Sequence, residues 1–288
     1  MFKDNSWYTH RKILSDYCKC DDVPIYGTIQ HGWFKIKESE INDLKLSLFP
    51  NCPLFCWSGN IKEQFYKNDI KNVIPIGAPF IYLADNFDEK IEIKNNVIVF
   101  PPHSDFEHDQ PSGFKDTEQL IEEMEKKFVG PYAVCLFYQD INNQIEKLYK
   151  SKNWKIFCCG NRFHPEFLNN FIRFAKSSNN VVVYELTSAS LYSLYLKINT
   201  FFFKSKKINR NYFGDEVNLH EYDEFDNLKI LADENVKMEK KIELANEILG
   251  KKYKKSEKEL ANILGLNSIV KIKIASTMRK IKILFNLF

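Results

Sequence analysis

Val97-Ile98-Val99-Phe100 is followed at once by Pro101 and Pro102, and a short apolar run that stops at turn residues is the pattern that decides the fold. An uninterrupted run of this kind is typical of a strand that is buried on both faces. Strands that alternate with helices predict an α/β fold with parallel sheets covered by helices. Similar runs recur with helical segments between them, at residues 23–29, 53–57, 73–77, 132–138, 154–159, 181–184 and 200–203.

A polar stretch at residues 85–96 separates the first three runs from the rest and is a candidate domain boundary. The sequence therefore predicts an N-terminal α/β domain over residues 1–90, a C-terminal α/β domain over residues 91–265, and a basic, apolar tail over residues 266–288. Thr117 and Asp140 are expected to begin helices, because hydroxyl and acidic residues are favoured at helix N-termini. Helices are expected at 117–128, 140–150, 165–176, 235–249 and 256–264.

Composition limits the class of protein. The 288 residues are 44% hydrophobic and 15% aromatic, which excludes a disordered chain and a small disulfide-stapled scaffold. The 41 basic and 38 acidic residues leave a net charge of +3, so no global field argues for a nucleic-acid partner. A polar start without a signal-peptide pattern, and seven cysteines without zinc-module spacing, predict a cytoplasmic protein with reduced thiols and no metal site.

The stretch from residue 267 to residue 288 is basic without any acidic residue. Its basic residues are Lys271, Lys273, Arg279, Lys280 and Lys282. At 100° per residue, Lys271, Arg279 and Lys282 fall on one side of a helix and Lys273 and Lys280 fall nearly opposite. Two interpretations stay open: a tail that lies on an anionic membrane surface, and a terminal helix that packs on the protein.

The first candidate for chemistry is the turn Gln30-His31-Gly32-Trp33, directly after the predicted strand at 23–29. The carboxyl ends of strands in open α/β sheets form the rim where ligands bind. His31 could accept a proton from an acceptor hydroxyl at neutral pH, and Gly32 would let a substrate approach the backbone. The alternative is an ordinary turn with a hydrogen-bonded imidazole.

A second candidate follows the strand at 97–100. His103 and Ser104 would contact a ligand at this strand end, although a loop that turns on two prolines explains much of the pattern. Asp105, Glu107 and His108 crowd nearby, but their spacing matches no helical pair of metal ligands.

Two further turns are candidate phosphate sites. Arg162, His164 and Pro165 follow the strand at 154–159, and a helix beginning at Pro165 would place His164 at an N-terminus that favours an anion. After the strand at 181–184, Thr187, Ser188 and Ser190 would donate hydroxyl hydrogens to phosphate oxygens. Both sets also fit plain helix caps. Because the two turns end consecutive strands, we expect them to be spatial neighbours.

The order of these turns resembles the pattern of bacterial glycosyltransferases of the two-Rossmann, GT-B type. Over about residues 23–265 the chain is similar to enzymes with cytidine-activated donors, namely the polysialyltransferase and Kdo-transferase groups and the glycerophosphotransferases of teichoic acid synthesis. It also resembles proteins of polysaccharide loci in the runs 97–104, 135–141 and 187–190. Unlike several sialyltransferase groups, it has no acidic pair followed by glycine in the N-terminal half.

The resemblance implies two Rossmann-like domains facing a cleft, a nucleotide-sugar donor held in the C-terminal domain, and a glycan or lipid-linked glycan acceptor at a cell surface. His31 would be the base, and no metal cofactor would be required. Glycerophosphate-type transfer from a CDP donor, a non-catalytic nucleotide- or glycan-binding protein and a nucleotide-sugar epimerase are the alternatives. The sequence has no Gly-rich dinucleotide fingerprint and no P-loop, which argues against NAD- and ATP-dependent enzymes. The expected location is the cytoplasm, or the inner face of the cytoplasmic membrane.

Overall fold

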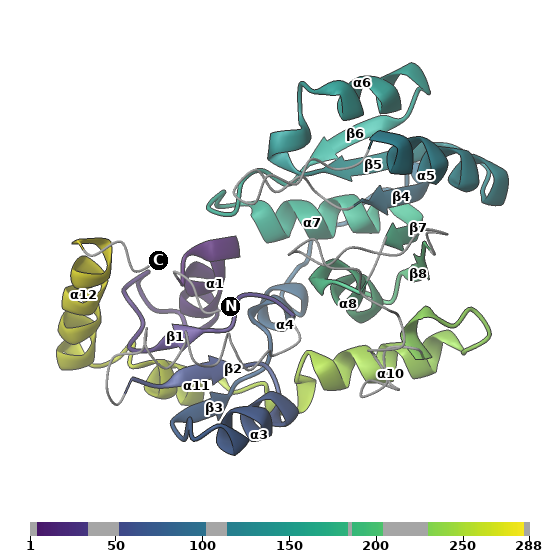
Figure 1. Ribbon diagram of the computed structural model, residues 1–288. Coiled ribbons are helices and arrows are strands. Elements are labelled where there is room, and N and C mark those ends of the chain that lie inside the picture. Colours follow the sequence, from purple (N-terminus) through teal and green to yellow (C-terminus); the bar gives the residue numbers. More distant parts are fainter. Residues whose placement is uncertain (1–4, 34–51, 102–113, 184–185, 204–229, 285–288) are drawn as a thin grey trace. The chain divides into compact units, whose positions relative to one another are not determined.

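Each of the eight apolar runs overlaps a strand, and every strand pairing in the computed structural model is parallel. The structure describes residues 5–33, 52–101, 114–183, 186–203 and 230–284, and within these residues the strands form two separate sheets (Figure 1). Within the described residues, a helix connects the second and third strands of the smaller sheet and each pair of consecutive strands in the larger sheet. The predicted α/β class with parallel sheets is therefore confirmed.

The chain divides into two compact units. The first comprises Met1–Asp88, Arg162–Pro165 and Asn246–Phe288, and the second comprises Glu89–Asn161 and Glu166–Ala245. The C-terminal part of this division differs from the domains expected from the sequence, because residues 246–265 and the short segment 162–165 belong to the first unit.

The return of the C-terminal segment to the first unit has a clear physical basis in its hydrogen bonds. The Ala78 amide donates to the Leu249 carbonyl at 2.9 Å, and the Tyr17 hydroxyl donates to the Lys255 carbonyl at 2.9 Å. The Lys254 ammonium pairs with Asp85 at 2.6 Å. Local polarity in the sequence could not reveal these contacts, since their partners are more than a hundred residues apart.

The first unit is built on a three-stranded sheet in the order β1-β2-β3. Its strands are β1 (Thr28–Ile29), β2 (Leu54–Cys56) and β3 (Val73–Pro75). Its helices are α1 (His10–Tyr17), α3 (Gly59–Lys67), α4 (Pro79–Ala84), α11 (Glu257–Leu264) and α12 (Ile269–Leu284), with 3-10 turns η1 (Trp7–Thr9) and η5 (Lys251–Tyr253). Alternate residues of β2, Leu54 and Cys56, pack with Phe65 of α3 and Val73 of β3 in a buried cluster, which fixes α3 against the sheet.

The second unit is built on a five-stranded sheet in the order β6-β5-β4-β7-β8. Its strands are β4 (Asn95–Phe100), β5 (Tyr132–Leu136), β6 (Lys155–Cys158), β7 (Ser178–Val183) and β8 (Asn199–Phe202). Its helices are α5 (Phe114–Lys127), α6 (Gln144–Ser151), α7 (Phe167–Lys176) and α8 (Ser188–Tyr195), with the 3-10 turn η3 (Tyr138–Asp140); α10 (Met238–Ile248) follows β8 in the chain and runs into the first unit. The chain starts at the central strand β4, builds outward through β5 and β6, and then returns to add β7 and β8 on the other side.

Several helices begin at residues other than the expected ones. Helix α5 starts at Phe114, so Thr117 lies inside it and is buried rather than capping it. Asp140 ends η3, and α6 is capped instead by Asn143, whose side chain accepts from the amides of Ile145 and Glu146. The Asn143 side chain can reach the second and third amides of the helix, which is the geometry that an N-cap requires.

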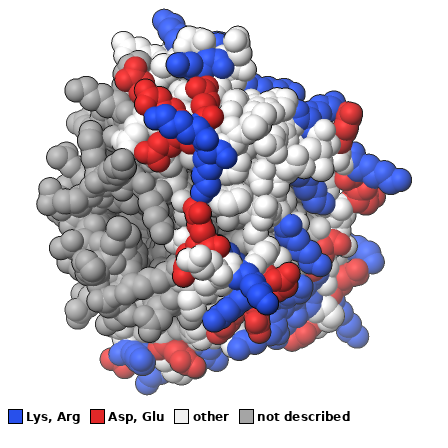
Figure 2. All heavy atoms as spheres, turned by 90° about the vertical axis from the view of Figure 1, so that its right-hand side faces the viewer, with Lys and Arg blue, Asp and Glu red and all other residues white. Residues whose placement is uncertain are grey.

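The described surface carries both charge signs. On the face drawn in Figure 2, lysine and arginine side chains lie intermixed with aspartate and glutamate side chains around an uncharged area. No helix in the described part of the chain is long and apolar enough to cross a membrane.

Candidate functional site

The turn that carries His31 is anchored by its neighbour Gln30, which is completely buried. The backbone amide of Trp57 donates to Gln30 Oε1 at 2.9 Å, and the Trp57 indole donates to the Gln30 carbonyl at 3.1 Å. Gln30 Nε2 donates in turn to the Gly32 carbonyl at 2.9 Å. These bonds join the carboxyl ends of β1 and β2, so the backbone on both sides of His31 is fixed.

The imidazole of His31 is held by two aromatic rings. The Trp7 ring lies edge-on to it at a centroid distance of 5.2 Å, and the Tyr8 ring stacks on it at 6.2 Å with an interplanar angle of 19°. Such edge-on and stacked contacts restrict the orientation of a ring. His31 is half-buried, so it is oriented by the protein and still partly exposed to solvent.

Arg162 lies at the same aromatic cluster, in the first unit. Its guanidinium lies 4.3 Å from the centroid of the Trp7 ring, and its carbonyl accepts from the Tyr8 amide at 2.6 Å. Phe163 adds a third ring, 6.2 Å from Trp7 and 57% exposed. His31 and Arg162, which the sequence placed in different domains, thus both contact Trp7. The planar guanidinium of an arginine is suited to bind an anionic group.

The N-terminal segment that supplies Trp7 and Tyr8 has an unusual backbone. Tyr8 and Thr9 both have left-handed conformations, with φ values of 53° and 60°. Each such residue costs on the order of 1 kcal/mol and persists only where the surroundings hold it. Asn5 does so from one side, because its side chain donates to the Gly27 carbonyl and accepts from the Ile29 amide, both at 2.9 Å.

Sequence reasoning missed Trp7 and Tyr8 as neighbours of the site. The segment has no helical or strand periodicity that would place it, and its partners in β1 are more than 20 residues away. The one sequence feature that could have indicated this segment as part of a site is the close spacing of Trp7, Tyr8 and His10.

His10 belongs to the same cluster but differs in character from His31. It is 1% exposed, its Nε2 has no hydrogen-bond partner among the described residues, and its ring lies 5.9 Å from Tyr8. Burial lowers the pKa of His10 to about 3, so this histidine is neutral at physiological pH. Burial also raises the pKa of the Tyr8 hydroxyl, while the charge of Arg162 acts in the opposite direction.

The second unit contains a point where the strand order reverses. Strands β4 and β7 are neighbours, with Phe100 opposite Val183 at their carboxyl ends, but the chain leaves β4 toward β5 and leaves β7 toward β8. The connecting segments therefore separate at this place, and open α/β sheets bind ligands in the crevice that results. His103 and Ser104 follow β4 but lie outside the described residues.

Helix α8 begins close after β7 and presents two hydroxyl residues at its N-terminus. Thr187 is the N-cap and Ser188 the first helical residue, and both are half-buried. Ser190 is fully buried, and its hydroxyl accepts from the Thr187 amide at 3.1 Å and donates to the Thr187 carbonyl at 2.6 Å. Ser190 therefore stabilises the start of the helix. Of the three predicted phosphate-binding residues, Thr187 and Ser188 are the candidates at the start of α8.

The expectation that the turns after β6 and β7 follow adjacent strands is wrong. Strands β5 and β4 lie between them, which puts the two strand ends three spacings, or roughly 14 Å, apart. Consecutive strands are adjacent only when the chain does not cross to the other side of the sheet, and here it does so between β6 and β7.

The helix expected to begin at Pro165 begins instead at Phe167, with Glu166 as its N-cap residue. His164 and Pro165 are exposed and precede the helix, so His164 does not stand at its first turn. The Glu166 carboxylate pairs with Arg173 of α7 at 3.0 Å. A negative charge at this position makes the start of α7 less favourable for a phosphate than the start of α8, whose first turn has no acidic residue.

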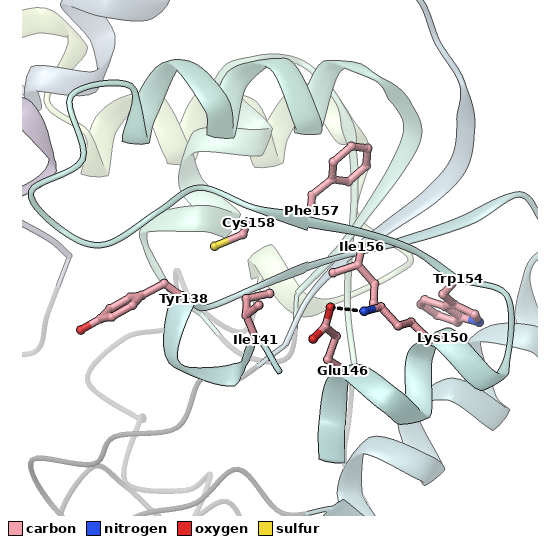
Figure 3. A pocket seen from close by; sticks show the side chains of 8 residues that line it. All are labelled: Tyr138, Ile141, Glu146, Lys150, Trp154, Ile156, Phe157 and Cys158. Atoms are coloured by element: carbon pink, nitrogen blue, oxygen red, sulfur yellow. Dashed lines mark ion pairs between the residues drawn. The ribbon is translucent and has the colours of Figure 1, made fainter. Parts of the chain in front are cut away.

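An open pocket of about 660 Å³ lies in the second unit along the edge strand β6 (Figure 3). Its charged groups, Glu146 and Lys150, form an ion pair at 2.7 Å, and Glu146 also accepts from the Asn142 amide. Lys150, with the Asn142 amide, lowers the pKa of Glu146. The remaining lining is apolar or aromatic, from Tyr138, Ile141, Trp154, Ile156, Phe157 and Cys158. This pocket is not at the strand-order reversal and has no excess positive charge for a phosphate.

No group of three or more metal-ligating side chains comes together within the described ranges. The Cys135 and Cys159 sulfurs lie 3.5 Å apart as thiols. Buried Cys135 has a raised pKa, because it shares a hydrogen bond with Cys159 and is desolvated.

Comparison with known proteins gives no family: no protein-family model matches this sequence, and no curated protein sequence matches it.

Proposed function

We propose that this protein is a glycosyltransferase of the GT-B type. In the cytoplasm, it would move a sugar from a nucleotide-activated donor to a hydroxyl of an acceptor, and this acceptor would be a glycan of the cell surface. The observation that carries the proposal is the strand-order reversal between β4 and β7, with the start of α8 beside it. Nucleotides bind at this place in open α/β sheets.

The donor is assigned to the second unit. Amides at the start of α8 and the hydroxyls of Thr187 and Ser188 provide hydrogen-bond donors for phosphate oxygens, and the helix dipole favours their negative charge. His103 and Ser104 follow the adjacent strand and are candidate contacts to the same ligand. Charge on the departing nucleoside phosphate would be stabilised by these groups, so we expect activity without a metal ion.

The acceptor is assigned to the first unit, where His31 is the candidate base. Its imidazole is oriented by Trp7 and Tyr8, which keeps it ready to accept the proton of an acceptor hydroxyl. The hydroxyl oxygen would then attack the anomeric carbon of the donor, and the bond to the nucleoside phosphate would break. Arg162, with His164 beside Pro165 in the same short segment, is the candidate for contacts to an anionic group of either substrate.

Thermal unfolding against CMP, CDP, UDP, GDP and ADP, each with and without EDTA, tests the donor site. A ligand at a hundredfold excess over its Kd stabilises the native state by about 2.7 kcal/mol, which raises the melting temperature by roughly 5 °C. We expect such a shift with CMP or CDP, and we expect it to survive EDTA. Selective stabilisation by UDP or GDP would keep the fold assignment and change the donor.

A pair of variants at one position separates phosphate binding from helix stability. Ser188→Asp places a negative charge where the phosphate is expected but favours the helix dipole, so the variant should fold and lose the nucleotide shift. Ser188→Asn, which is similar in size and neutral, should keep most of the shift. If no nucleotide stabilises the wild type, or if the nucleotide shifts the melting temperatures of both variants equally, the donor site is not at α8. A glycerophosphoryl product from a CDP donor would identify the related phosphotransferase instead.

A further inference from the structure

The C-terminal helix α12 carries charge of one sign, since its sequence holds basic residues and no acidic residue. Five basic residues and no acidic residue occur between positions 267 and 288. On the face drawn in Figure 2, by contrast, both signs are intermixed. The helix belongs to the first unit and stands in yellow in Figure 1.

One side of α12 packs on its own unit. Ala275 is 6% exposed, and the Lys271 ammonium lies 5.9 Å from the centroid of the Tyr26 ring. The Lys271 stem also passes Gly265 so closely that a Cβ there would lie 2.7 Å from it. Lys271 is therefore directed toward the protein, as expected for a terminal helix that packs on the fold.

The opposite side of α12 is exposed and mixes aliphatic side chains with lysines. Ile269 is 71% exposed, Val270 68% and Ile274 43%, and Lys273 and Lys280 are exposed between them. At 100° per residue these five positions span about 140° of the helix. We call this set (Ile269, Val270, Lys273, Ile274 and Lys280) the outer face of α12. Adjoining exposed aliphatic side chains with polar residues at their rim are typical of an interaction surface.

We propose that the outer face of α12 docks on an anionic lipid surface. The aliphatic side chains would enter the boundary between headgroups and acyl chains, while the lysine stems lie along the apolar layer and their ammonium groups reach lipid phosphates. The charge pattern favours this occupant over a second copy of the chain. A two-fold dimer through this face would bring the lysines of both copies together without any carboxylate on α12 to pair with them.

This inference does not depend on the proposed function, because it concerns a helix that supplies none of the candidate catalytic or donor-binding residues. Co-sedimentation with vesicles tests it directly. Wild-type protein should bind vesicles of phosphatidylcholine mixed with phosphatidylglycerol, bind phosphatidylcholine alone much more weakly, and lose affinity as salt is raised.

Two variants on the outer face and one control elsewhere make the test specific. Each basic residue near an anionic surface contributes about a fivefold gain in affinity, so Lys273→Gln with Lys280→Gln should weaken binding about 25-fold. Ile269→Ser with Val270→Ser should weaken it at least tenfold with charge unchanged. Lys67→Gln with Lys71→Gln removes the same charge from exposed positions of the first unit and should bind like the wild type.

Circular dichroism and melting temperature would establish that all variants fold alike. If the outer-face and control lysine variants weaken vesicle binding equally, the binding depends on net charge alone, and the proposal is overturned. Failure of the wild type to bind the anionic vesicles would overturn it as well. A concentration-dependent dimer that the Ile269→Ser and Val270→Ser variant abolishes, without vesicle binding, would assign the face to a second copy instead.

Discussion

In the first unit, the His31 side chain after β1 is held by residues from distant parts of the sequence, whereas in the second unit the strand order brings two strand ends to adjacent positions. His31 is oriented by Trp7 and Tyr8 from the N-terminal segment, and Arg162 arrives from a short segment after β6. The start of α8, in contrast, lies beside the end of β4 because β7 pairs with β4.

Two kinds of structure therefore place candidate side chains at strand ends in this protein. A sheet with a reversal of strand order leaves a crevice through backbone topology, so the side chains there need few supports. A small sheet in the simple order β1-β2-β3 has no such reversal among its described strands, and its candidate base depends on packed side chains. Substitutions should therefore disturb the first site through packing and the second through charge.

The largest expected effect separates the two sites by function. His31→Gln removes the candidate base, so transfer from the donor identified by thermal unfolding should fall by about 10²–10⁴-fold in kcat. The melting-temperature shift produced by the nucleotide should stay as in the wild type, because the donor is assigned to the other unit. Unchanged transfer, measured as product formed per enzyme, would remove His31 from the chemistry.

Gln30→Ala should be the most destabilising of the substitutions considered for the first site. It leaves the buried Trp57 amide and the half-buried Gly32 carbonyl without their partner, which costs about 2–4 kcal/mol of unfolding free energy. Gln64→Ala on α3, where the side chain is half-buried, should change the value by less than about 0.5 kcal/mol. Chemical denaturation measures both, and similar losses would contradict the anchoring role of Gln30.

His10 should make the first unit sensitive to acid. Its pKa is about 3 in the folded protein against 6.5 as the ordinary value, so between these limits the unfolded chain binds a proton that the folded chain does not. The contribution of neutral His10 to the free energy of unfolding is complete above pH 6.5 and is lost as the pH is lowered toward 3. The loss is about 2 kcal/mol between pH 7 and pH 5. Denaturation of wild type and His10→Gln at both pH values isolates this contribution, since the variant should lose it. A parallel decline in both proteins would show that other groups cause the acid sensitivity.

The smallest expected effect concerns the cap of α8 in the second unit. Ser190→Ala removes a hydroxyl that bonds to both backbone groups of Thr187, and the loss should be about 1 kcal/mol without a change in the nucleotide shift. Ser193→Ala, where a buried hydroxyl bonds to the Ala189 carbonyl within the same helix, is the matched control and should cost less. If Ser190→Ala has normal stability but its melting temperature no longer rises with the nucleotide, Ser190 contacts the ligand.

Local sequence was sufficient for the elements and for some of their ends. The apolar runs at 97–100 and 181–184 became β4 and β7, and Ser256 caps α11 at the start of the segment expected to be helical from that residue. It was insufficient for helix starts where two caps compete, as with Asp140 and Asn143. Side-chain reach to particular amides decides such cases, and that depends on the exact course of the turn.

The amino-acid pattern alone was sufficient to predict an α/β chain with parallel strands, and it indicated polar turns at strand ends as candidate sites. Those properties depend on apolar runs and turn residues, which act over a few neighbours in the chain. Long-range packing places β7 against β4, residues 246–288 in the first unit, and both His31 and Arg162 at the Trp7 ring. Such choices depend on burial and hydrogen bonding between segments far apart in sequence, whose free energy is gained only when the whole fold brings them together.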